Sequence, residues 1–159
     1  MLKVHLPPNT VEYQPRSLKV FLAGTIDMGE SRDWQSEMIA NLSDGNYDNP
    51  VDVLNPRRPD WDSSWGNGHP KLIQQIEWEL DGLEKADDII MALMPGSKSP
   101  ISLLELGAFR DKRIHAYVPH EFYRHTNIAV FANRYGIALF PEWTQFKKYM
   151  RQIIIHRSF

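Results

Sequence analysis

The chain contains no cysteine among its 159 residues. This absence excludes a disulfide framework, a thiolate zinc site and a cysteine nucleophile. A large excess of charge of one sign is missing too, because 18 Lys and Arg against 20 Asp and Glu give a formal net charge of −2. Proteins that bind nucleic acids or anionic membranes usually carry a basic face. We therefore expect neither kind of partner.

Long hydrophobic runs are also absent, and no apolar segment approaches the roughly 20 residues that span a bilayer. The segment from Met1 to Pro15 lacks the apolar core of a signal peptide. Neither a Gly-rich dinucleotide motif, a P-loop nor a G-x-S-x-G elbow occurs, and the six His never fall in an H-x-x-x-H pattern. We expect a cytoplasmic protein without a metal site or a cofactor.

Apolar runs alternate with helical patterns along the chain, which predicts an α/β fold with a parallel sheet and helices on both faces. We expect residues 1–16 to form an extended arm and residues 17–159 to form a single domain. About five strands favour a flavodoxin-like three-layer sandwich. The expected strands cover 18–23, 51–54, 88–94, 114–118 and 137–140. The first expected helix has its N-cap at Ser31. The expected helices cover about 34–42, 72–83, 101–110, part of 121–136 and 144–155.

In open α/β sheets the ligand binds at the carboxyl ends of the strands, where the strand order reverses. The strand order should reverse between the first and third expected strands. The site should therefore lie between the loops that follow them, Gly24 to Gly29 and Pro95 to Pro100. Gly24, Thr25 and Ser99 are accordingly candidate substrate-binding residues.

Glu105 is the main candidate for chemistry. It lies in the apolar segment Ser102–Phe109, just after the third expected strand. An isolated buried charge costs several kcal/mol, although a surface Glu near a helix N-terminus is the ordinary alternative. Its place at the predicted crevice favours a functional role.

Asp81 is the second candidate. It lies near the C-terminal end of its helix, where the helix dipole disfavours an anion. Lys85, four residues later, offers the alternative of a solvated ion pair on the helix surface. We expect the other acidic residues of this helix, Glu77, Glu79 and Glu84, to form a solvated face.

Trp61 and Trp65 lie in an irregular polar stretch, residues 57–70, in a chain with five Trp and eleven Pro. Stacking on a planar ligand and packing at a subunit interface are equally good explanations. A carboxylate nucleophile, a nearby acidic helper and aromatic walls suit glycosyl transfer, in which a carboxylate attacks an anomeric carbon and forms a glycosyl ester.

Three segments together resemble the nucleoside 2-deoxyribosyltransferase family, in its broader "like" branch. They are Phe21–Gly24, Leu80–Asp87 and Leu104–Ala108, and their order and spacing cover roughly residues 18–130. The resemblance implies a flavodoxin-like fold and a double displacement. A glutamate attacks C1′ of a deoxynucleoside and expels the base, and a second base then takes the sugar, as in nucleotide salvage.

Residue roles follow from the same resemblance. It implies that Glu105 is the nucleophile, that Asp81 assists at the leaving base, and that Asn127 is offered to the sugar by a neighbouring subunit. The expected substrates are a small nucleoside and a nucleobase, and Trp61 stays a candidate substrate-binding residue on the strength of its polar loop. The protein is then expected to be a homo-oligomer with shared active sites.

The chain departs from the family pattern at two places. Ser99 occupies the position six residues before the nucleophile, where the family often carries an aspartate, and Val20 and Phe21 lie where a tyrosine is common. Two alternatives therefore stay open. One is an N-glycosidase that hydrolyses nucleoside 5′-monophosphates, with Arg57 and Arg58 at the phosphate. The other is a nucleotide-binding module without catalytic activity.

Overall fold

The computed structural model describes residues 1–27 and 31–158 of the chain. Within these residues, six strands and five helices follow one another. They are β1 (Leu2–His5), β2 (Leu18–Gly24), α1 (Trp34–Ser43), β3 (Val51–Leu54), α2 (Pro70–Lys85), β4 (Asp88–Ala92), α3 (Pro100–Ala108), β5 (Arg113–Tyr117), α4 (His125–Tyr135), β6 (Ala138–Phe140) and α5 (Trp143–Arg157).

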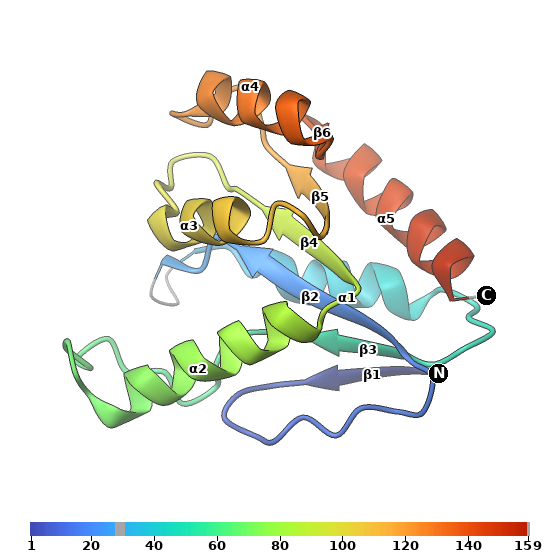
Figure 1. Cartoon of the computed structure of the whole chain (residues 1–159), viewed down its shortest axis with the longest axis horizontal. Coiled ribbons are helices and arrows are strands. Elements are labelled where there is room, and N and C mark those ends of the chain that lie inside the picture. Colours follow the sequence, from blue (N-terminus) through green and yellow to red (C-terminus); the bar gives the residue numbers. More distant parts are fainter. Residues whose placement is uncertain (28–30, 159) are drawn as a thin grey trace.

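All six strands belong to one parallel sheet in the order β1-β3-β2-β4-β5-β6 (Figure 1). From β2 the chain first adds β3 on one side and then crosses to add β4, β5 and β6 on the other side. This is the flavodoxin-like order, and the fold class is confirmed. The order reverses next to β2, as expected, so the carboxyl ends of β2 and β4 mark the crevice.

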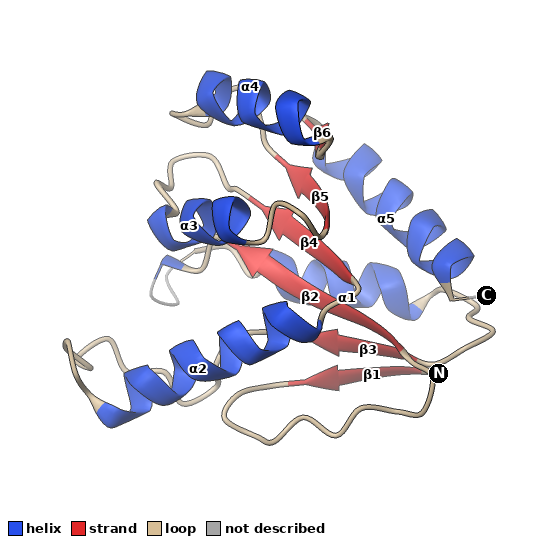
Figure 2. Ribbon diagram, in the orientation of Figure 1, coloured by secondary structure: helices blue, strands red, loops and turns tan. Residues whose placement is uncertain are grey.

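The sheet lies between two helical layers, with α2, α3 and α4 on one face and α1 and α5 on the other (Figure 2). Successive strand residues point to opposite faces. In β2, Phe21 and Ala23 therefore pack in the core under α2, α3 and α4, while Val20 and Leu22 pack against α1 and α5. Strands buried on both faces explain the nearly continuous apolar runs in the sequence.

The expected number of strands is one too low, because residues 2–5 form β1 and pair with β3 along the edge of the sheet. Asp52 on β3 fastens this segment. Its fully buried carboxylate accepts hydrogen bonds from His5 Nε2 at 2.8 Å and from the Gln14 backbone N–H at 2.8 Å. The short strand carries no continuous apolar run, but Leu2, Val4 and Leu6 alternate with Lys3 and His5, which is a strand signal that the expectation of an extended arm overlooked.

The N-cap of the first helix lies two residues later than expected. Asp33, not Ser31, is its N-cap, and the Asp33 carboxylate accepts a hydrogen bond of 3.1 Å from the backbone N–H of Ser36. The ambiguous segment 121–136 is helical over α4. No helix among the described residues is both long enough and apolar enough to span a bilayer.

Gly82 sets how closely α2 approaches the sheet. A Cβ at this position would lie 2.8 Å from side-chain atoms of both Phe21 and Leu54, which are fully buried. A Cβ at Gly107, on α3, would meet nothing within 4 Å. The two helical glycines therefore form a matched pair.

Replacing Gly82 by Ala should lower the free energy of unfolding by about 1–2 kcal/mol, because overpacking outweighs the better helix propensity of Ala. Gly107→Ala should raise it by about 0.5–1 kcal/mol through propensity alone. Urea denaturation followed by circular dichroism measures both. Equal effects of the two substitutions would contradict the close approach at Gly82.

Candidate active site

Glu105 lies in the second turn of α3, directly after the crevice loop, and its side chain is half-buried. Burial and, to a smaller extent, the nearby charge of Glu79 together raise the pKa of its carboxyl to about 8. A carboxyl group in this state keeps its proton at neutral pH more readily than an exposed one.

Glu79 on α2 provides the neighbouring carboxyl. Burial raises its pKa to about 7, although a hydrogen bond of 2.7 Å from the Gln75 amide N–H to Glu79 Oε1 acts in the opposite direction. A negative charge on Glu79 therefore disfavours ionisation of Glu105. In the described part of the chain, no three His, Asp or Glu side chains gather to hold a metal ion.

The expectation that Glu79 belongs to a solvated face is wrong, since the residue is half-buried. Its spacing from Leu72 and Leu83, seven residues after one and four residues before the other, places it on the inner stripe of α2. That spacing was a usable signal in the sequence. Leu80, the apolar residue next to Glu79 in the chain, is by contrast 40% exposed.

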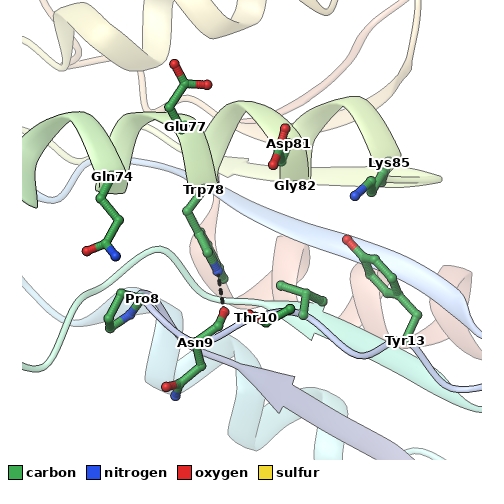
Figure 3. A pocket seen from close by; sticks show the side chains of 11 residues that line it. Pro8, Asn9, Thr10, Tyr13, Gln74, Glu77, Trp78, Asp81, Gly82 and Lys85 are labelled. Carbon is green, nitrogen blue, oxygen red and sulfur yellow. Dashed lines mark hydrogen bonds between the residues drawn. The ribbon is translucent and has the colours of Figure 1, made fainter.

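Asp81 lies on the opposite side of α2. Two residues span about 200° around an α-helix, so a helix that turns Glu79 inward turns Asp81 away from it. Asp81 is exposed and lines a groove of about 310 Å³ between α2 and the arm, which also includes Tyr13 and Lys85 (Figure 3). In this groove the Trp78 indole N–H donates to the Asn9 carbonyl at 3.0 Å. The structure thus pairs Glu105 with Glu79 and leaves Asp81 on the arm side.

Gly24, Thr25 and Ser99 meet where the strand order reverses. A Cβ at Gly24 would lie 2.2 Å from the Ala92 carbonyl oxygen, and its φ of 134° is open to glycine alone. The Thr25 hydroxyl lies 2.5 Å from the Ser99 hydroxyl and accepts a hydrogen bond from Met94 N–H at 2.9 Å. These contacts tie the two crevice loops together.

The chain of hydroxyls continues beyond Ser99. The Ser97 hydroxyl lies 2.9 Å from that of Ser99 and donates to Asp27 Oδ1 at 2.7 Å. Ser99 adopts a left-handed conformation, with φ 45°, immediately before α3. Such conformations persist where the surrounding structure fixes them. Ser97 and Asp27 were not among the residues expected here, and residues 28–30 of the first crevice loop lie outside the described part.

The tryptophans of the segment between β3 and α2 pack largely on each other. The buried Trp65 ring stacks on His69 and has Arg58 and Lys71 over it at 4.9 and 5.3 Å. Trp61 contacts Trp65 edge-to-face with 5.2 Å between ring centroids. Trp65 therefore serves the internal packing of this segment. Trp61 is half-buried, and its indole N–H has no partner.

Both arginines of this segment have protein partners. Arg57 Nε lies 3.2 Å from an Asp33 carboxylate oxygen and also reaches the Gln35 side chain. Arg58 Nε donates to Asp60 Oδ1 at 2.6 Å. Their guanidinium groups thus hold the loop in place through contacts within the protein.

Exposed apolar side chains lie near Glu79 and Glu105 along their own helices. Ile76 lies one turn before Glu79 and is 45% exposed, and Ile101 lies one turn before Glu105 and is 60% exposed. Leu104, beside Glu105 in the chain, is 67% exposed. The approach to the two carboxyls is therefore apolar.

A comparison with protein families matches residues 17–122 to the model described as "nucleoside 2-deoxyribosyltransferase like". The chain belongs to this family. No curated protein matches the chain. As a deoxyribosyltransferase-like protein it carries Gly24, Thr25, Ser99 and Glu105 in the matched span. Asn127 lies beyond that span, exposed on the first turn of α4.

Replacing Glu79 by Gln should lower the pKa of Glu105 from about 8, because the substitution removes the neighbouring negative charge. Carboxyl carbon NMR titration of protein labelled at the Glu side chains measures this change. Glu77→Gln is the matched control, since Glu77 is exposed on the same helix and lines the arm groove. An unchanged Glu105 titration in the Glu79 variant would rule out the coupling.

Proposed function

We propose that this protein transfers a 2-deoxyribosyl group between nucleobases through a covalent ester on Glu105. One observation carries the proposal: a half-buried Glu105 carboxyl coupled to a second carboxyl, Glu79, beside the crevice of a deoxyribosyltransferase-like fold. With pKa values of about 7 for Glu79 and about 8 for Glu105, the pair carries about one proton near neutral pH, more often on Glu105; the reaction uses the less populated form, in which Glu105 is the anion and Glu79 the acid. These are the two forms that a retaining glycosyl transfer needs.

In the first half of the reaction, the Glu105 carboxylate attacks C1′ and the bond from C1′ to the base nitrogen breaks. The electron pair goes to the base, which takes the proton of Glu79 and leaves as a neutral molecule. Glu105 now carries the sugar as an ester, and Glu79 is an anion. In the second half, another base attacks C1′, gives its N–H proton to Glu79 and releases the Glu105 carboxylate.

Glu79 is our candidate for the acid at the base because it is the carboxyl that interacts with Glu105. Asp81, which the resemblance assigns to this role, is exposed on the arm side of α2. Gly24, Thr25 and Ser99 are proposed to bind the sugar side of the substrate, and Trp61 to lie beside the base. The arginine pairings favour a nucleoside over a monophosphate, because Arg57 and Arg58 already face Asp33 and Asp60.

We further propose that the site is completed by a second copy of the chain. Ile76, Ile101 and Leu104 leave an apolar surface around Glu105 that a neighbouring subunit would cover. Asn127, exposed on α4, is then available to the sugar bound by the partner. An isologous contact offers the same residues in both directions.

Incubation with a deoxynucleoside and a different free base should yield the exchanged nucleoside, detected by liquid chromatography and mass spectrometry. Glu105→Gln should reduce the rate at least about 10³-fold because the nucleophile is lost. Glu79→Gln should reduce it about 10²-fold or more through loss of the acid. Glu77→Gln should leave it unchanged.

Release of free base without exchange would instead identify a hydrolase. In that case a 5′-monophosphate should be the better substrate, and Arg57 or Arg58 substitutions should reduce its turnover. Full activity of Glu105→Gln would eliminate the proposed nucleophile, and binding without any product would favour a nucleotide-binding module.

A shared site predicts complementation between two inactive variants. Glu105→Gln and Asn127→Ala should each have little activity alone, while their co-expression should restore about a quarter of the wild-type rate in a dimer, since half of the assemblies contain one intact site of two. Exchange assays on the co-purified protein measure this. Absence of any recovery in a mixed assembly would mean that Asn127 acts in the active site of its own chain or lies outside the site.

A further inference from the structure

Gln75 is a buried polar residue on the inner stripe of α2, with only 4% of its surface exposed. It lies one helical turn before Glu79 and faces Pro56, which follows β3. Burying an amide costs free energy unless its hydrogen bonds are replaced. The arrangement of its two polar atoms therefore indicates what the residue does.

The orientation of the Gln75 amide is fixed by its partners. Nε2 donates to the Pro56 carbonyl oxygen at 2.8 Å and to Glu79 Oε1 at 2.7 Å. A backbone carbonyl can only accept, so the NH₂ end must face Pro56. The amide oxygen, Oε1, is buried and has no hydrogen-bond partner among the described residues.

An unpaired buried acceptor destabilises a protein by about 1–3 kcal/mol. An apolar side chain of the same size would remove this loss but would leave the Pro56 carbonyl oxygen without its N–H donor. The two effects are of similar size, so stability alone does not account for Gln75, and the feature left to explain is the hydrogen bond that it gives to Glu79.

We propose that Gln75 is a positioning residue: its amide anchors the Glu79 carboxyl to the β3–α2 loop and stabilises the ionised form of that carboxyl. The inference rests on the proposed function. In that reaction Glu79 becomes an anion when it gives its proton to the leaving base, and the Gln75 N–H stabilises this anion at that moment. The charge facing Glu79 from the neighbouring helix α3 is that of Glu105.

The sign of the effect follows from which form the hydrogen bond favours. Donation to the carboxylate lowers the pKa of Glu79, against the larger effect of burial. Removal of the donor should therefore raise the pKa of Glu79 above about 7. The acid form then persists to higher pH, and delivery of its proton becomes harder.

The test uses Gln75→Met, which keeps the shape of the side chain and removes the N–H donor. Carboxyl carbon NMR titration of the free protein should show the pKa of Glu79 raised by about one unit. The melting temperature at pH 6 should change little, because removal of the unpaired oxygen offsets loss of the hydrogen bond to the Pro56 carbonyl. Gln152→Met, at an exposed position of α5, is the control and should shift neither quantity.

Base exchange gives a second measurement. In Gln75→Met the alkaline limb of the rate profile should move up by about one pH unit, and kcat should fall about tenfold at unchanged KM, since Gln75 does not bind the substrate. Gln75→Asn keeps an amide but shortens it, so that it cannot reach Pro56 and Glu79 together. It should shift the titration in the same direction, and it serves if the Met variant does not fold.

The two proposals fail in different ways. An unshifted Glu79 titration in the Gln75 variants overturns the role of Gln75, whatever the activity. A shifted titration in a protein that exchanges no base supports Gln75 as the positioning residue of Glu79 and overturns the proposed function instead.

Discussion

Two carboxyl groups that repel each other are kept together by helix packing on one face of the sheet. Leu83 of α2 and Leu106 of α3 are buried in the same apolar core, together with Phe21 of β2. This core fixes the inner stripes of both helices and leaves Glu79 and Glu105 between buried surface and an exposed apolar rim. Hydrophobic burial over many residues thus offsets an electrostatic repulsion confined to two. Loss of that packing would let the carboxyls separate and return to ordinary titration.

The sheet supplies the second constraint. At Gly24 the strands β2 and β4 approach so closely that no Cβ fits beside Ala92. The loops that follow these strands are then near enough for Thr25 and Ser99 to share a hydrogen bond. Because α3 starts directly after Ser99, the same contact fixes where its second turn, and hence Glu105, is placed. The reversal of strand order provides the crevice, and this short hydroxyl link determines its geometry.

Much of this arrangement was predictable from the sequence, for identifiable reasons. The buried strands β2, β3 and β4 appear as apolar runs between turn residues, and Glu105 stands out as one charge in an apolar helix. β1 has the apolar–polar alternation of a strand, but its place in the sheet was not predictable, since it is held by the buried pair of His5 with Asp52, whose partners lie 47 residues apart. The orientation of α2 was harder to predict, because Ile76 and Leu80 are apolar but exposed, while Glu79 is half-buried. Exposed apolar side chains of this kind make the inner face of a helix difficult to identify from the sequence.

The apolar rim and the carboxyl pair are linked by the same electrostatics. Repulsion between two anions grows as water is excluded, because the effective dielectric constant around them falls. In the proposed reaction, a base and a second subunit would cover Ile76, Ile101 and Leu104 and exclude water from Glu79 and Glu105. Closure would then penalise the doubly ionised pair most and favour the state with one proton. The exposed apolar side chains would thus, once covered, favour the singly protonated pair that the proposed reaction requires.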